Sequence, residues 1–145
     1  MVTFQNIEQQ LRELKGSLIA NPASKGELTI VKEALAEFGI EYIPDELTDF
    51  HYHMDGFVWN GIEIYPFNPS NFNHEYSPKE FVKAVRNIVE RKNCKWICFG
   101  AWDEEYFIYR VETKEYVIAD RMDFMVFDTF SSLSQLLEYV IAVRS

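Results

Sequence analysis

Hydrophobic positions near the N-terminus follow helical spacing in two separate runs. In the first run an apolar residue recurs at every third or fourth position, which predicts a helix over about residues 3–18. The second run starts at Ser24 and Glu27, whose spacing matches a capping box, and stops before Gly39. Its apolar stripe consists of Leu28, Val31, Leu35 and Phe38. Two amphipathic helices, separated by the loop "ANPASKGE", are therefore expected to open the fold.

The next stretch, "IPDELTDFHYHMDGFVWNGIEIYP", combines signals for a helix, a turn and a strand. Pro44 suits the first turn of a helix, and the acidic Asp45 and Glu46 suit the positive end of its dipole. A buried stripe follows, formed by Leu47, Phe50 and Met54. Gly56 ends the helix, "WNG" indicates a turn, and "IEIYPF" alternates as a strand does. The prolines and glycines here are explained by backbone geometry, so the stretch is interpreted as fold architecture.

The C-terminal half contains two further helices and several strands. Ser77 is expected to cap a helix with Pro78 at its first position, and Ser132 with Gln135 caps another. Between these helices, "WICFG", "YFIYRV", "EYVIAD" and "FMVFD" are typical of strands, and "ETK" joins the middle two as a hairpin. Strands joined by short turns form antiparallel sheets. The pattern predicts a single α+β domain over residues 1–145, with about four to six strands and helices mainly on one face.

The order of these features resembles the SUKH superfamily, which is named after a yeast cell-wall-synthesis regulator and its bacterial relatives. In that family a helix with a glutamate near its end precedes an apolar-Pro pair, a short helix and an Asn-Gly or Asp-Gly turn. The matching residues here are Glu37, Ile43-Pro44-Asp45, Phe50, Asp55-Gly56 and Asn60-Gly61. Later features match through Phe99-Gly100, Tyr106 and Phe130-Ser131. The resemblance extends from about residue 28 onward, and the predicted helix over residues 3–18 is an addition to it.

The resemblance implies a protein-binding role. Many bacterial members of the superfamily look like immunity proteins, which bind and neutralise a toxin domain, often a nuclease. A regulatory or scaffold domain of the same fold that binds a housekeeping protein is the alternative. An adjacent toxin gene would favour the first role, and a solitary gene among metabolic operons would favour the second.

Charge is compatible with a basic protein partner. The 145-residue chain has a formal net charge of -9, which disfavours direct binding to nucleic acid because phosphate repels such a surface. Residues 79–95 are the exception, since Lys79, Lys83, Arg86, Arg91, Lys92 and Lys95 outweigh Glu80 and Glu90. The alternative explanation is that the acidic surface serves only to keep the protein in solution. The sequence shows neither a membrane-length apolar run nor a signal-peptide pattern, so no membrane partner and a cytoplasmic location are expected.

Catalytic and metal-binding signatures were sought without success. The sequence contains no GxSxG, glycine-rich phosphate loop, HExxH or CxxC motif, so neither enzymatic activity nor a cofactor is predicted. His51 and His53 diverge on a helix, and His74 has no second ligand beside it. Cys94 and Cys98 are too far apart on a strand to form a disulfide, which predicts reduced thiols.

One acidic cluster remains as a candidate partner-binding site. Asp103, Glu104 and Glu105 lie between two aromatic residues, Trp102 and Tyr106. A charged turn between strands explains the cluster structurally, whereas an acidic patch with aromatic anchors would suit a basic partner. A catalytic carboxylate pair is the third interpretation. Trp59, beside a turn, is a further candidate for partner contact, with core packing as its alternative.

Overall fold

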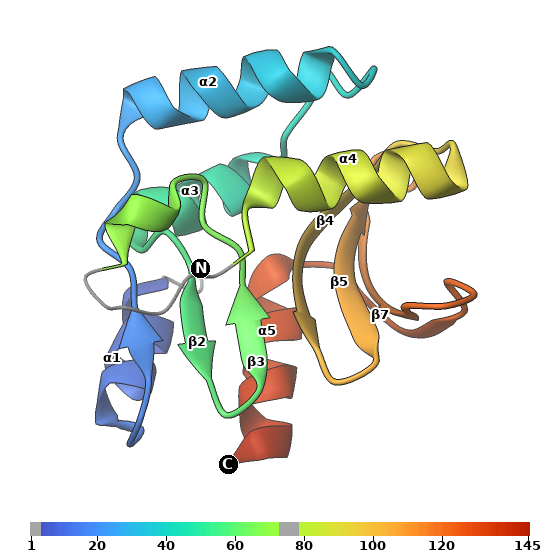
Figure 1. The fold of residues 1–145 in the computed structure, drawn as a ribbon. Helices are drawn as coiled ribbons and strands as arrows, with labels where there is room; N and C mark the ends of the chain where they lie inside the picture. Colours follow the sequence, from blue (N-terminus) through green and yellow to red (C-terminus); the bar gives the residue numbers. More distant parts are fainter. Residues whose placement is uncertain (1–3, 73–78) are drawn as a thin grey trace.

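Helices dominate the first part of the chain, and four consecutive strands precede the C-terminal helix, in a computed structural model that describes residues 4–72 and 79–145 (Figure 1). The helices are α1 (Phe4–Glu13), α2 (Lys25–Ala36), α3 (Asp45–His53), the short 3-10 helix η1 (Pro69–Asn71), α4 (Phe81–Lys92) and α5 (Leu133–Arg144). The strands are β1 (Leu18–Ile19), β2 (Phe57–Trp59), β3 (Ile62–Ile64), β4 (Trp96–Trp102), β5 (Glu105–Arg110), β6 (Glu115–Asp120) and β7 (Val126–Phe130).

The described strands form one antiparallel sheet in the order β1-β2-β3-β4-β5-β6-β7. Each strand therefore lies beside its neighbours in the sequence, and β1 and β7 are the two edges. This arrangement confirms the predicted α+β class. The seven described strands exceed the predicted range by one.

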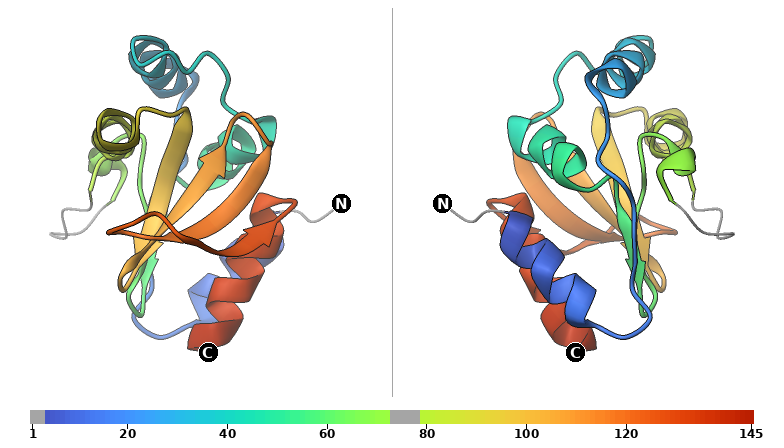
Figure 2. Two further views of the ribbon diagram at one scale, coloured as in Figure 1. Left: turned by 90° about the vertical axis from the view of Figure 1, so that its right-hand side faces the viewer. Right: turned by 90° about the vertical axis from the view of Figure 1, so that its left-hand side faces the viewer.

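Helices cover both faces of the sheet, rather than mainly one face as predicted. Interior positions of β4, β5 and β6 are buried one after another, which requires cover on both sides because successive side chains point to opposite faces. Figure 2 shows α4 on one face and α5 on the other. Contacts to the two tryptophan rings of β4 support this arrangement. Tyr139 of α5 contacts Trp102 on one face, and Lys92 of α4 lies over Trp96 on the opposite face.

The N-terminal helix is shorter than predicted. It ends at Glu13 instead of reaching residue 18, and Gly16 adopts a left-handed conformation with a φ of 85° that turns the chain back. Leu18 and Ile19 then pair with Val58 and Phe57 as strand β1. Helical spacing of Leu18 was therefore misleading, because its apolar side chain belongs to a strand.

Two predicted helix starts are confirmed and one is corrected. Ser24 and Glu27 form the capping box of α2, and the Ser132 hydroxyl accepts a hydrogen bond from the Gln135 N–H at the start of α5. The predicted cap of α4 at Ser77 and Pro78 lies outside the described residues. The helix itself begins at Phe81, because its N-cap residue Glu80 has an extended backbone with φ -81° and ψ 141°. The Lys79 N–H, before the helix, donates to the Glu63 carboxylate over 2.9 Å.

Candidate protein-binding surface

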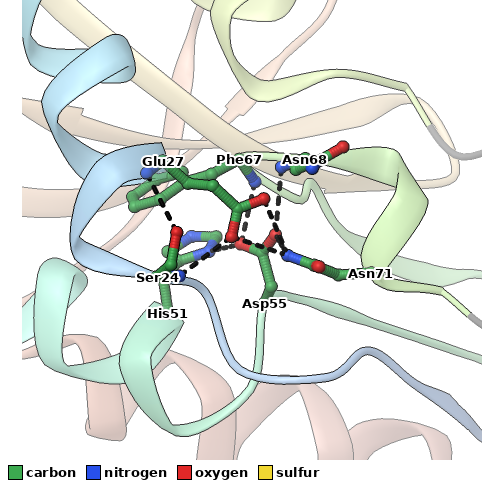
Figure 3. Close-up of polar contacts among 7 residues, drawn as sticks. All are labelled: Ser24, Glu27, His51, Asp55, Phe67, Asn68 and Asn71. Carbon is green, nitrogen blue, oxygen red and sulfur yellow. Dashed lines mark hydrogen bonds and ion pairs between the residues drawn. The ribbon is translucent and has the colours of Figure 1, made fainter.

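A buried polar centre joins α3 to the segment after β3 (Figure 3). His51 and Asp55 are fully buried, and the His51 Nδ1 lies 2.6 Å from the Asp55 carboxylate. That carboxylate also accepts hydrogen bonds from the N–H groups of Phe67 and Asn68 over 2.8 and 3.0 Å. The Asn71 amide donates a further bond over 2.7 Å. The Asp55 carboxylate is thereby fully occupied with partners from its own chain.

The same centre also reaches the start of α2. The Asn71 amide lies 3.3 Å from both carboxylate oxygens of Glu27, which is the capping-box partner of Ser24. The Ala23 N–H donates to the His51 carbonyl over 2.8 Å. Three segments that are distant in sequence are thus held by one network, and its role is to fix the fold.

Burial separates this centre from any substrate. The His51 ring stacks on Phe67 with ring centroids 3.8 Å apart, and it meets the edge of Phe81. Its Nε2 has no hydrogen-bond partner and no exposed surface. Within residues 4–72 and 79–145 no group of His, Cys, Asp and Glu side chains is arranged to hold a metal ion. His53 pairs with Glu8 of α1, whereas His74 lies outside the described residues.

The two cysteines are free thiols in separate environments. Cys98 is buried in β4, and burial raises its pKa to about 12. Cys94 is partly buried in the turn before β4, and burial raises its pKa as well. A thiol is nucleophilic only as the thiolate, so neither is set up as an activated nucleophile.

Glu27 should make stability depend on pH. Partial burial raises the pKa of Glu27, but hydrogen bonds from the Ser24 N–H and from Asn68 and Asn71 outweigh it, so that the pKa lies below its ordinary value of 4.5. A carboxylate whose pKa is lowered by folding stabilises the fold at pH values above its ordinary, unfolded-state pKa. This stabilisation is lost as pH falls through the folded-state pKa. Glu27→Gln should therefore be destabilised relative to the parent at pH values above 4.5, and the difference should shrink as the pH falls below the ordinary pKa of 4.5 and through the lower folded-state pKa.

Urea unfolding measured across this pH range would check the prediction. Glu33→Gln, on an exposed position of the same helix, is the matched control, because it removes a carboxylate without removing these hydrogen bonds. A constant difference between Glu27→Gln and the parent at every pH would contradict the assignment.

Part of the predicted site, formed by Trp102, Asp103 and the turn after Trp59, lies around Arg144 at one end of the sheet. The Arg144 guanidinium lies 4.9 Å from the Trp102 ring centroid, donates to the Asn60 carbonyl over 3.1 Å and pairs with Asp103. The Trp102 indole N–H donates to Glu105 over 2.7 Å. The turn after Trp59 and the turn between β4 and β5 are thus brought together, as a cluster of internally paired charges.

The aromatic members of that prediction are core residues. Trp59, Trp102 and Tyr106 are at most 7% exposed. Tyr106 also points to the opposite face from Trp102, where it stacks on Phe124. Asp103 and Glu104 are exposed. The carboxylates of this site are therefore accessible, but the rings are not positioned as anchors for a partner.

An exposed apolar surface lies next to these acids, and the sequence analysis did not identify it. Met122, Met125 and Phe127 are exposed to 83%, 58% and 50%. These three residues, here called the methionine surface, span the loop between β6 and β7 and the start of β7. The exposure of three large apolar side chains within six residues makes this segment the candidate interaction surface.

Hydrogen bonds hold the loop of the methionine surface in one conformation. The Asp120 carboxylate accepts from the N–H groups of Met122 and Asp123 over 2.7 and 3.2 Å. The Asp123 carboxylate accepts from the Met125 N–H over 2.9 Å, and the Asp120 N–H donates to the Met125 carbonyl over 2.9 Å. These are the local side-chain-to-backbone bonds of Asx turns. The two methionines are thus presented by a preorganised turn.

Phe124, between the two methionines, adopts an unusual backbone conformation. Its φ is 60°, a left-handed value that is costly for a bulky residue. Its buried ring is surrounded by Arg91, Lys92, Trp96 and Tyr106. The predicted strand "FMVFD" therefore begins later than expected, at Val126, because Phe124 turns into the core while its neighbours turn outward.

A hydrogen bond places the acidic turn beside the methionine surface. The Arg121 N–H donates to the Glu104 carbonyl over 2.9 Å, which links the turn between β4 and β5 to the loop between β6 and β7. Glu104 and Asp123 are both exposed. The exposed carboxylates of Glu104 and Asp123 are here called the acidic border of the methionine surface. The cations Arg91, Lys92 and Arg121 also lie near this loop, against the rings of Phe124 and Tyr106. Asp residues at Asx spacing around methionines, in "DRMDFMVFD", were the sequence signal for it.

Comparison with known proteins finds neither a matching family model nor a matching curated protein. Within the described part of the chain, no helix is both long and apolar enough to cross a membrane. The surface is therefore interpreted from its own shape and chemistry.

Proposed function

We propose that this chain is a protein-binding module that recognises a partner with a basic surface through the methionine surface and its acidic border. The observation that supports this most directly is the rigid turn that exposes Met122 and Met125. These exposed side chains do not contribute to the core. Because their loop is already held in one conformation, binding a partner would cost less ordering entropy.

The chemistry of the surface favours a protein partner. Methionine is flexible and polarizable, so it adapts to irregular apolar surfaces. Carboxylates at the border attract a basic partner over long range and exclude acidic ones. A centre of apolar residues within a charged rim is the usual organisation of a protein–protein interface.

The resemblance to the SUKH superfamily suggests a specific role, in which the chain acts as an immunity protein that covers a toxin domain. The acidic border is compatible with this role, because nuclease domains commonly carry basic surfaces. The alternative is a regulatory or scaffold domain that binds a housekeeping protein with the same surface. Co-expression with the product of an adjacent gene separates them, since only an immunity protein rescues growth from that product's toxicity.

Non-enzymatic function is part of this proposal. Two observations support it: the His51–Asp55 pair is sealed from solvent, and its carboxylate is occupied by backbone donors. An active site requires groups that substrate can reach.

Removing the methionines should abolish recognition without unfolding the protein. The double variant Met122→Ser, Met125→Ser should bind the partner about 10- to 100-fold more weakly, because two apolar anchors are lost. Its free energy of unfolding should change by less than about 0.5 kcal/mol, since both side chains are exposed. Calorimetric titration of the co-purified partner and urea unfolding measure the two quantities.

Ile30→Ser is the matched control, because Ile30 is also exposed, on α2. It should leave the affinity unchanged. Equal affinities for the parent and the methionine double variant would refute the proposed surface.

A further inference from the structure

Strand β7 is an open edge of the sheet. It spans Val126–Phe130 and pairs only with β6 among the described strands. The opposite edge, β1, comprises only Leu18 and Ile19. An edge strand presents backbone N–H and carbonyl groups that can pair with another chain. The longer of the two edges is therefore the one beside the methionine surface.

The edge lacks two common protective features, and its irregularity points a side chain outward. β7 contains neither lysine nor proline, and the two features that limit pairing along it are Asp128 and a β-bulge. A bulge lies where Asp128 pairs with Ile118 and Val126 pairs with Ala119, which leaves Phe127 without a cross-strand partner. Phe127 is thereby half exposed, and regular pairing resumes from Asp128 to Phe130.

We propose that the partner adds an extended basic segment to β7, pairing along Asp128–Phe130 and placing an apolar side chain against Phe127. This inference rests on the proposed protein-binding function and specifies its mode. When a strand is added to a sheet edge, backbone hydrogen bonds supply the affinity. The side chains of every second residue in the added strand supply the specificity through the pockets that they enter. Here the residues of the added strand that extend just beyond the paired stretch would meet Phe127 and Met125.

Charge selects a basic segment over a second copy of this chain. Within residues 120–128 the acids Asp120, Asp123 and Asp128 outnumber the one base, Arg121, and the chain carries a net charge of -9. Two β7 strands paired with each other would bring these carboxylates together, and like charges across a strand pair are destabilising. Arginine or lysine in the added strand would instead meet opposite charge.

Peptide binding tests this mode directly. The probe is a peptide of about eight alternating Arg and Val residues, which is long enough for one strand. Its control has the same side chains but carries an N-methyl group at every residue, so neither edge of the peptide can donate to the backbone ladder. We expect the parent peptide to slow amide exchange in residues 126–130, and the N-methylated peptide to bind at least about tenfold more weakly. A Glu–Val peptide should not bind.

Several outcomes would overturn the inference: no binding of the Arg–Val peptide, equal binding of the N-methylated peptide, or unchanged exchange in residues 126–130. Self-association in sedimentation that Thr129→Lys abolishes would overturn it in favour of a second copy. If the co-purified partner still depends on Met122 and Met125, the proposed function survives while strand addition fails. If that dependence is also absent, the proposed function itself is wrong.

Discussion

Asp55→Ala is expected to lower the free energy of unfolding by about 3–5 kcal/mol, the largest effect of any substitution considered. The carboxylate is fully buried, and it accepts hydrogen bonds from His51, Phe67, Asn68 and Asn71. Its removal leaves backbone N–H groups buried without acceptors, and each such group costs about 1–3 kcal/mol. Urea unfolding followed by tryptophan fluorescence would measure the change.

Asp49→Ala provides the control for that measurement. Asp49 lies on the same helix, α3, but is exposed, so its loss should change stability by less than about 0.5 kcal/mol. If Asp55→Ala also cost less than about 1 kcal/mol, the polar centre would not be holding the three segments together.

Gly56→Ala should be the second most damaging change, at about 3 kcal/mol or more. Two separate effects contribute to this cost. The φ of Gly56 is 104°, a conformation that residues with a side chain rarely adopt, and an added Cβ would lie 2.3 Å from the Ile64 carbonyl oxygen. That oxygen belongs to the backbone of β3, so it cannot move without disturbing the sheet. The midpoint of thermal or urea unfolding reports the loss.

Gly16→Ala separates the two effects. Gly16 has a similar φ of 85°, but an added Cβ would meet nothing within 4 Å. This variant should therefore carry only the conformational cost, about 1–2 kcal/mol. Equal losses for the two variants would mean that the close approach to Ile64 contributes nothing.

Local signals predicted most of the fold. Pro44, the capping box of α2 and the Ser132 cap of α5 mark helix starts because they act on neighbouring backbone groups. The run "EYVIAD" matches β6 at both ends. Leu18 was assigned to the wrong element because its strand partner, Val58, lies far along the chain. Cover on both faces of the sheet was missed for a similar reason, since it depends on where α4 and α5 pack.

The candidate site was harder to predict than the fold. Trp102 and Tyr106 flank carboxylates in the sequence, yet burial removes both rings from the surface. Exposure of Met122 and Met125 depends on the left-handed turn at Phe124, and no residue type signals that turn as glycine does. Methionine in a strand-like run is normally assigned to the core, so the Asp spacing in "DRMDFMVFD" was overlooked and the methionine surface emerged from the three-dimensional arrangement.

The sequential strand order has a consequence for biosynthesis. Strands β4 to β7 each pair with the strand that the ribosome has just produced, so hairpins can form as the chain emerges. Helix α5 follows β7 and covers one face of the sheet. Until α5 is made, Phe107 and its neighbours on that face stay exposed to water. We therefore expect the nascent chain to engage chaperones up to that point and to release them once the last helix docks.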